Sequence, residues 1–296
     1  MALGPLNHCR VADGPGRIVW LASYPKSGNT WMRIVLGNLL GVASPDGDIN
    51  EQASEDGIAS CRLDFDDIVG VNAAELGADQ VDRLRPRVYE QLSDETDRLL
   101  FLKIHDAYTN TPAGEPMIPL RATRGVVHIV RNPLDVVISL AHHHGADLPA
   151  TLNFFSDDEA SIGASDHRWS EQLRQRLLDW SSHTASWLNA PLPRLTVRYE
   201  DMLGQPYEVF AAVARFCGLD SESARLNKAV DAGRFERLRE LESQGRFKET
   251  PRHGKKFFRE GKAGGWQDVL TPEQVALVVS RHGATMRLLG YGGGES

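Results

Sequence analysis

The 296-residue sequence predicts an α/β fold in which a central parallel sheet is flanked by helices. Short apolar runs at 17–22, 99–105 and 126–130 lack helical spacing, as expected for parallel strands that are buried on both faces. Segments with helical spacing alternate with these runs, and no linker rich in Pro, Gly or Ser interrupts the pattern. A single α/β domain can reach this length, so we expect one domain.

The first strand, 17–22, leads into a tight loop and a helix. A proline and a glycine punctuate the loop, and helical spacing starts at Thr30, so we expect Asn29 or Thr30 to cap the helix. The backbone N–H groups of 27–31 then converge and attract phosphate, and Lys26 adds a full positive charge. The glycine spacing excludes a Walker loop. A strand-loop-helix unit without a ligand is the alternative.

The second strand, 99–105, ends with two side chains that suit a reaction site. Alternation along a strand places Lys103 and His105 on the same side of the sheet, so an ammonium and an imidazole meet at one point. A histidine at a strand end also occurs in purely structural roles, and this alternative stays open.

The third strand, 126–130, is followed directly by Arg131. The carboxyl end of a strand is where ligands bind in an open α/β sheet. Pro133 suits the first turn of the next helix, and Ser139 lies two turns further on, so its hydroxyl faces the same crevice. The alternative is that Arg131 pairs with Asp135 and that the serine bonds its own backbone.

The second half of the chain adds three segments with candidate ligand contacts. The run 194–202 reads as a further strand and contains Tyr199. Phe235 precedes leucines with helical spacing, where a core role and a ligand contact are both open. The segment 257–266 contains three glycines, so we expect a loop whose backbone approaches a ligand closely, or else an ordinary surface loop.

Three of these segments resemble motifs of the sulfotransferases that use 3′-phosphoadenosine 5′-phosphosulfate (PAPS). They are Tyr-Pro-Lys-Ser-Gly-Asn-Thr-Trp at 24–31, Arg-Asn-Pro-Leu-Asp-Val-Val-Ile-Ser at 131–139, and Phe-Phe-Arg-Glu-Gly-Lys-Ala-Gly-Gly-Trp at 257–266. The resemblance covers roughly residues 17–290 and implies a P-loop-like three-layer fold. Outside it we expect a polar leader at 1–16, which lacks the apolar core of a signal peptide, and a flexible tail at 291–296.

The resemblance also implies which residues bind PAPS and catalyse the transfer, with adenosine 3′,5′-bisphosphate (PAP) as product. His105 is the general base, Lys26 stabilises the leaving group and Lys103 binds sulfuryl or 5′-phosphate oxygens. Arg131 and Ser139 hold the 3′-phosphate, and Ser139 counts among the catalytic residues. The other donor-binding residues lie in the loop, at the adenine and in the closing segment: Ser27, Gly28, Asn29, Thr30, Trp31, Tyr199, Phe235, Arg259, Glu260 and Gly261. Glu260 replaces the family's usual lysine and removes one cation near the 3′-phosphate.

The acceptor implied by the resemblance is a small molecule with a hydroxyl or amine group, whose identity the sequence leaves open. His142–His144 follow on the helix after Arg131, and consecutive helical side chains point different ways and cannot share one metal ion. We therefore expect them at the rim of the acceptor pocket. The acidic stretch 145–168 lacks periodicity and reads as a mobile lid or as a solvated loop without function.

The charge of the chain limits its partners. A net charge of −7 and a pI near 5.8 argue against binding nucleic acid or a membrane surface, so the clustered cations indicate a small anionic ligand. Three scattered cysteines and the lack of an 18-residue apolar run suggest a cytoplasmic protein. The transfer requires no metal, and a homodimer is left open. The alternatives are a P-loop-like small-molecule kinase, which depends on Mg²⁺, and a catalytically silent nucleotide-binding protein.

Overall fold

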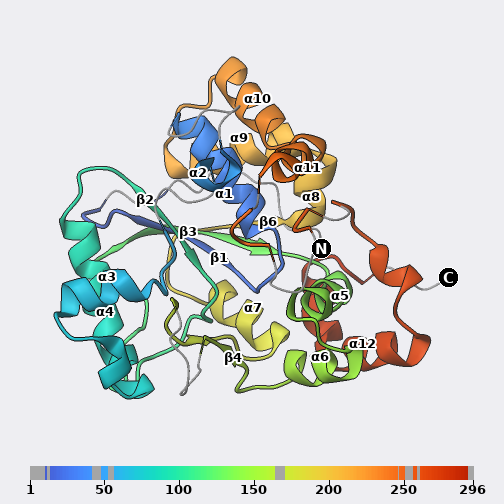
Figure 1. Ribbon diagram of the computed structural model, residues 1–296, viewed down its shortest axis with the longest axis horizontal. Helices are drawn as coiled ribbons and strands as arrows, with labels where there is room; N and C mark the ends of the chain where they lie inside the picture. The colour runs from blue at the N-terminus through green and yellow to red at the C-terminus, as the bar shows by residue number, and fades with distance from the viewer. Residues whose placement is uncertain are drawn as a thin grey trace.

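The computed structural model describes residues 11, 14–41, 48–52, 57–163, 171–245, 247–250, 256–258 and 261–292. Its centre is a four-stranded parallel sheet with the strand order β2-β1-β3-β6 (Figure 1). The strands are β1 (Ile18–Ser23), β2 (Leu100–Ile104), β3 (Thr123–Val130) and β6 (Arg194–Arg198). The expected α/β fold with a central parallel sheet and the first three expected strands are confirmed.

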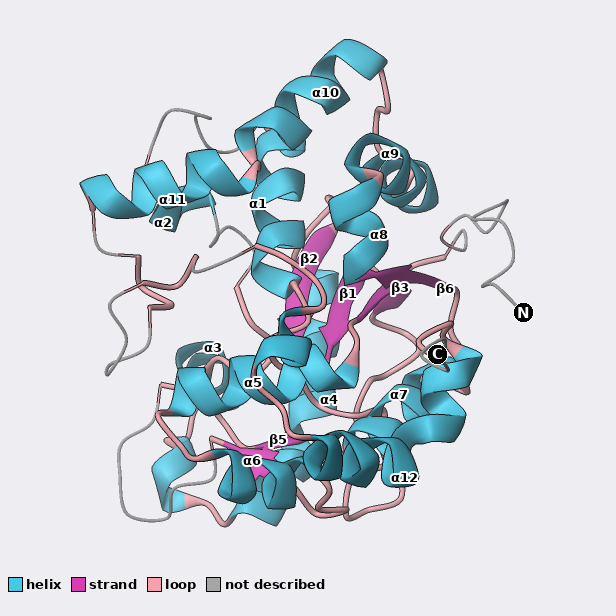
Figure 2. Ribbon diagram, turned by 90° about the vertical axis from the view of Figure 1, so that its right-hand side faces the viewer, coloured by secondary structure: helices cyan, strands magenta, loops and turns pink. Residues whose placement is uncertain are grey.

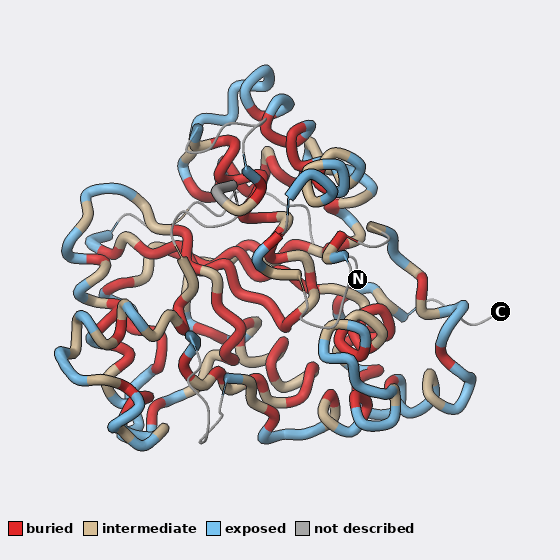
Figure 3. The backbone as a smooth tube through the Cα atoms, in the orientation of Figure 1, coloured by how far each residue is buried: buried red, intermediate tan, exposed pale blue. Residues whose placement is uncertain are grey.

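Helices cover both faces of this sheet (Figure 2). On one face, Val19 and Leu21 of β1 pack in a core with α1, α9 and α10, whereas Ile18 and Trp20 face the opposite core beside α4 and α7. The helices of these two layers are α1 (Asn29–Leu40), α9 (Pro206–Cys217), α10 (Ser223–Ala232), α4 (Ala78–Asp94) and α7 (Trp180–Leu188). Strands β1 and β3 are therefore buried on both faces, as their apolar sequences predict (Figure 3).

Trp20 connects the sheet to the helical layer that contains α4 and α7. Its indole Nε1 donates to Thr123 Oγ1 on β3 at 2.9 Å, and its ring lies edge-on to Tyr89 of α4 with the centroids 5.0 Å apart. The Tyr89 hydroxyl donates in turn to the Ala59 carbonyl at 3.0 Å. Truncating a fully buried tryptophan costs about 3–5 kcal/mol, so this side chain stabilises the sheet that carries the site.

A third apolar cluster supports the segment after β3. It joins α5 (Pro133–His144), α6 (Leu148–Phe155) and α12 (Pro272–Leu288) around Leu140, Phe155 and Met286. The remaining elements are α2 (Ile49–Gln52), α3 (Arg62–Val69), η1 (Ala73–Glu75), β4 (Ser161–Ile162), β5 (Gln175–Arg176), α8 (Tyr199–Gly204), α11 (Phe235–Gln244) and η2 (Gly265–Asp268).

The segment 145–168 differs from the loop that its sequence predicts. It contains α6 and strand β4, which pairs antiparallel with β5, and 164–168 lie outside the described residues. Asp147 caps α6 by accepting from the Ala150 N–H at 2.7 Å, and the buried Leu152 and Phe155 face the core. The helix itself contains no acidic residue, but eight residues show too little helical periodicity to stand out between the acidic residues on either side.

Two element boundaries also differ from expectation. The N-cap of α1 is Gly28, so Asn29 and Thr30 are its first helical residues, and the run 194–202 changes from strand to helix at Tyr199. Most of the expected leader at 1–16 and of the tail at 291–296 lies outside the described residues. Among the residues that the structure describes, no helix is both long and apolar enough to cross a membrane.

Candidate active site

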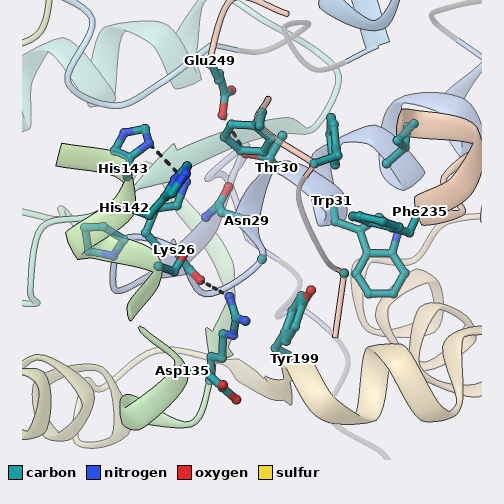
Figure 4. Close-up of a pocket in the computed structure, with 18 of the residues that line it drawn as sticks. Lys26, Asn29, Thr30, Trp31, Asp135, His142, His143, Tyr199, Phe235 and Glu249 are labelled. Carbon is teal, nitrogen blue, oxygen red and sulfur yellow. Dashed lines mark hydrogen bonds between the residues drawn. The ribbon is translucent and has the colours of Figure 1, made fainter. Parts of the chain in front are cut away.

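A cavity of about 400 Å³ lies beside the carboxyl ends of the central strands, at the N-terminus of α1. Its lining side chains come from the β1–α1 loop, the end of β2, the whole length of α5, and the segments around 235, 249 and 257 (Figure 4). Apart from Ser27, which is buried beneath the loop, every predicted site residue that the structure describes borders this cavity.

The loop between β1 and α1 contains two left-handed residues that shape an anion cradle. Lys26 and Gly28 both adopt left-handed backbone conformations, with φ of 69° and 103°. A Cβ at Gly28 would lie 2.6 Å from the Tyr199 ring, so the position requires glycine. The Asn29 side chain turns back to β1 and donates to the Leu21 carbonyl at 2.7 Å. Asn29 thus fixes the loop through its side-chain amide nitrogen, while its Oδ1 atom is buried without a hydrogen-bond partner in the described part of the chain.

The Lys26 ammonium is held by two neighbours. It lies 3.4 Å from His143 Nδ1 and 4.4 Å from the centroid of the Phe257 ring. Burial lowers the pKa of Lys26 to about 8, which leaves it charged near neutral pH. Burial, followed by the charge of Lys26, lowers the pKa of His143 to about 3. The imidazole of His143 is therefore neutral and accepts a hydrogen bond from the ammonium.

His105 is oriented for proton transfer. Its Nδ1 lies 2.7 Å from the Ser23 carbonyl oxygen, an acceptor, so Nδ1 carries the ring proton. Nε2 is then the basic atom of the ring. Burial and the nearby positive charge of Lys103 hold the pKa of His105 well below its usual value. His105 is consequently neutral at physiological pH and able to accept a proton.

Lys103 reaches the cavity beside a carboxylate that the sequence motifs do not predict. Glu249 lies 3.8 Å from the Lys103 ammonium, accepts the Thr30 hydroxyl at 2.6 Å and pairs with Arg33 at 2.8 Å. Burial raises the pKa of Glu249, but Lys103, Arg33 and the Thr30 hydroxyl outweigh it and hold the pKa at about 2. No local pattern around Glu249 marks it, because its partners come from α1 and β2, far away in the sequence.

Arg131 lies over the face of Tyr199, with the guanidinium carbon 4.3 Å from the ring centroid. It donates to the Lys26 carbonyl at 3.0 Å, and Ser139 borders the same cavity from α5. Asp135 instead accepts the N–H groups at 264 and 266, at 2.8 and 3.1 Å. The alternative of an Arg131–Asp135 pair is therefore wrong, since Asp135 anchors the glycine-rich segment 261–266 against α5.

Aromatic side chains form another wall of the cavity. Trp31 and Tyr199 pack edge to face with their centroids 6.0 Å apart, and Phe235 stands at the start of α11 (Figure 4). A Cβ at Gly261 would lie 2.3 Å from the Phe235 ring, so this glycine allows the segment to pack directly on the ring. Arg259 and Glu260 lie outside the described residues.

Several buried polar atoms at this site lack a protein partner. In the part of the chain that the structure describes, Trp31 Nε1 and Arg131 Nε, two donors on residues that border the cavity, are buried without a hydrogen bond. Such atoms are rare in folded proteins, and a ligand with several oxygen atoms is one way to satisfy them. The three histidines at the end of α5, His142–His144, border the cavity, as predicted for the rim. Within the described ranges, no group of three or more potential metal ligands occurs.

Comparisons with known proteins find relatives among sulfotransferases. Flavonol 3-sulfotransferase of Flaveria bidentis is 23% identical over 286 residues, which cover 90% of this chain and 82% of the relative. Sulfotransferase 1B1 of Canis lupus familiaris is 26% identical over 266 residues, with 86% and 78% covered.

Solved structures share the fold at lower sequence identity. A mouse sulfotransferase in complex with PAP is 17% identical with a TM-score of 0.55, and the match covers 93% of this chain and 88% of that one. A retinol dehydratase in complex with androsterone and PAP is 17% identical with a TM-score of 0.59, covering 94% and 82%. The model of the sulfotransferase domain matches residues 17–290. Because that match spans most of the chain, the protein belongs to the sulfotransferase domain family.

Proposed function

We propose that this protein transfers a sulfuryl group from PAPS to a hydroxyl or amine of a small molecule by in-line displacement. The observation that carries the proposal is that one cavity contains both the charged Lys26 in its N–H-rich loop and the neutral imidazole of His105. Membership of the family supports the reaction class, and PAP in two structural neighbours supports the donor.

The lining residues fit such a donor. We assign the phosphosulfate to Lys26, Lys103 and the loop N–H groups, where a helix N-terminus adds its dipole. We assign the 3′-phosphate to Arg131 and Ser139, and the adenine to the aromatic wall of Trp31, Tyr199 and Phe235. The unpaired Trp31 Nε1 and Arg131 Nε atoms, on two residues that border the cavity, support this assignment. Roles for Arg259 and Glu260 stay predictions.

The reaction needs a base at the acceptor and a positive charge at the leaving group. His105 Nε2 takes the acceptor's hydroxyl proton, while the Ser23 carbonyl holds the Nδ1 proton and fixes the tautomer. The acceptor oxygen bonds to sulfur as the bond from sulfur to the phosphate oxygen breaks. Lys26 and the N–H groups of α1 stabilise the negative charge that develops on that leaving oxygen.

We place the acceptor beside His142–His144, Ile162 and Phe257, at the part of the cavity away from the aromatic wall. This mixed polar and apolar lining suits a small molecule, and the acidic chain disfavours nucleic acid and membrane surfaces. We further propose a single domain over 17–290 and a cytoplasmic location. A screen of phenols, alcohols and amines with PAPS, read out as sulfated product, identifies the acceptor.

Binding of PAP and 5′-AMP tests the donor assignment. PAP should bind at least about 100-fold more tightly, because its 3′-phosphate gains two charge-assisted hydrogen bonds worth roughly 1.5–3 kcal/mol each. Arg131→Ala should remove most of this preference and leave the affinity for 5′-AMP nearly unchanged. Calorimetric affinities within threefold of each other in the unmodified protein would exclude a 3′-phosphate site.

A further inference from the structure

The Glu249 carboxylate borders a cavity whose Lys26, Lys103 and Arg131 side chains suit an anionic ligand. Its Oε2 atom accepts the Thr30 hydroxyl at 2.6 Å and lies 3.8 Å from the Lys103 ammonium, while Oε1 accepts from Arg33 at 2.8 Å. Figure 4 shows the side chain pointing into the site from above Thr30. Glu249 and Thr30 are 219 residues apart in the sequence, so only the fold brings them together.

The other acidic side chain that borders the cavity has a structural task. Asp135 accepts two N–H groups of the glycine-rich segment 261–266, whereas Glu249 faces cations and a hydroxyl of the site itself. Within the described residues, Glu249 is therefore the carboxylate that contacts groups proposed to hold the donor. Two of its three partners, Thr30 and Lys103, carry that proposed role.

We infer that Glu249 is an internal anion that occupies Thr30 and Lys103 in the free protein and competes with the phosphosulfate of the donor. A carboxylate oxygen accepts the same hydroxyl and ammonium donors as a phosphate or sulfate oxygen. The inference rests on the proposed function, since it takes Thr30 and Lys103 as donor ligands.

Two features make this competition persistent. The pKa of Glu249 near 2 keeps the carboxylate ionised throughout the physiological range, so protonation does not relieve it. Arg33 is itself buried and anchors Oε1, so the negative charge stays near the site even when Oε2 releases its partners. The charge thus opposes every ligand that carries a 5′-phosphate, including the product, and it accelerates product release, a step that limits turnover in many enzymes.

Glu249→Gln tests the inference because it removes the charge and keeps the shape. The amide oxygen still accepts from Arg33 and the amide group still reaches Thr30, so the fold should be retained. We expect the variant to bind PAP at least about tenfold more tightly, because the repulsion between two nearby unit charges at an effective dielectric constant near 20 exceeds a factor of ten, and the lost pairing of Glu249 with Arg33 and Lys103 offsets only part of it. The dissociation rate constant of PAP in stopped flow should fall by a similar factor, and the gain should shrink at high salt.

Three controls separate the explanations. Glu249→Asp keeps the charge and should not tighten binding, and Glu208→Gln makes the same change of net charge at an exposed position on α9 and should leave affinity unchanged. Arg131→Ala should weaken PAP binding. If the unmodified protein does not bind PAP at all, the proposed donor site is wrong. If it binds PAP and Arg131→Ala weakens this binding, the donor site is supported, and the Glu249→Gln result then tests the role of Glu249 alone.

The inference is overturned if Glu249→Gln binds PAP with equal or lower affinity, because the carboxylate then positions the cations instead of competing for them. Should Glu249→Gln prove unstable in thermal melting, the same comparison is made between Arg33→Met and the double variant Arg33→Met/Glu249→Gln. The double variant removes the Arg33–Glu249 pair as a unit and leaves the Lys103 ammonium without its carboxylate partner, available to the phosphosulfate. It should bind PAP more tightly than Arg33→Met, and the reverse order contradicts the inference.

Discussion

Replacing His105 with asparagine separates its proton-accepting role from its structural role. The amide nitrogen of asparagine reaches the position of imidazole Nδ1, so it can still donate to the Ser23 carbonyl, which now lies 2.7 Å from Nδ1. The variant has no atom in the position of Nε2, the basic atom. It also lacks part of a buried ring, a loss of volume that costs about 1–2 kcal/mol in the free energy of unfolding.

The catalytic loss should exceed this structural cost. A general base contributes roughly 10²–10⁴-fold to the rate, so kcat on an alcohol should fall by at least about 100-fold, or about 2.7 kcal/mol in the activation barrier. The affinity for PAP should stay within about twofold of the unmodified protein, because His105 is not assigned to the donor.

Single-turnover rates with a series of phenols measure this effect. An acidic nitrophenol reaches the site already ionised and needs no base, so it should recover much of the lost rate, whereas an unactivated alcohol should not. The reasoning is refuted if His105→Asn keeps a rate within threefold of normal on the alcohol. His105 is then structural, and the base must be sought among His142–His144.

Three further predictions address the cradle. Lys26→Ala should lower both kcat and donor affinity, and nitrophenol should restore its rate less than it restores the rate of His105→Asn. In the unmodified protein, kcat/KM for the donor should fall as pH rises through about 8, because the Lys26 ammonium is charged only below its pKa. A flat profile from pH 7 to 9.5 would contradict this role of Lys26. Gly28→Ala places a Cβ 2.6 Å from the Tyr199 ring at a φ of 103°. It should lower the free energy of unfolding by about 1–3 kcal/mol and weaken PAP binding. A melting temperature and a Kd like those of the unmodified protein would show that the loop adapts. Asp135→Ala frees two N–H groups of the segment 261–266 and should raise KM for the donor more than it lowers kcat, and hydrogen exchange at that segment should accelerate; unchanged exchange would argue against the anchor.

The sequence predicts the sheet and the cradle well because both depend on local signals. The apolar strands 17–22 and 126–130 are buried on both faces, so their composition alone marks them. The left-handed backbone at Gly28 is a local signal, although its contact with Tyr199 is long-range, and Arg131 and Ser139 are placed by a strand end and helical spacing. These features bring Lys26, His105 and Arg131 to one cavity, as predicted.

Other features are set by contacts between distant segments, which no local pattern records. Glu249 acquires its partners only when the segment at 247–250 packs against α1 and β2. His143 is one of three consecutive histidines, and only the packing of α5 against the loop selects it as the neighbour of Lys26. The helix at 148–155 is missed because it is short and lies between acidic residues. The role of Asp135 has no local signal either, because its partners are backbone N–H groups 129 and 131 residues away.

The central claim is that this protein moves a sulfuryl group from PAPS to a small-molecule acceptor without a metal ion. The most direct measurement incubates purified protein with PAPS, a panel of phenols and amines, and excess EDTA, and quantifies PAP and sulfated acceptor together by mass spectrometry. We predict one equivalent of PAP for each sulfated acceptor, and loss of both products in Lys26→Ala. Absence of sulfated product across the panel despite tight PAP binding would indicate a silent nucleotide-binding protein, and phosphorylated acceptor formed only with ATP and Mg²⁺ would indicate a kinase.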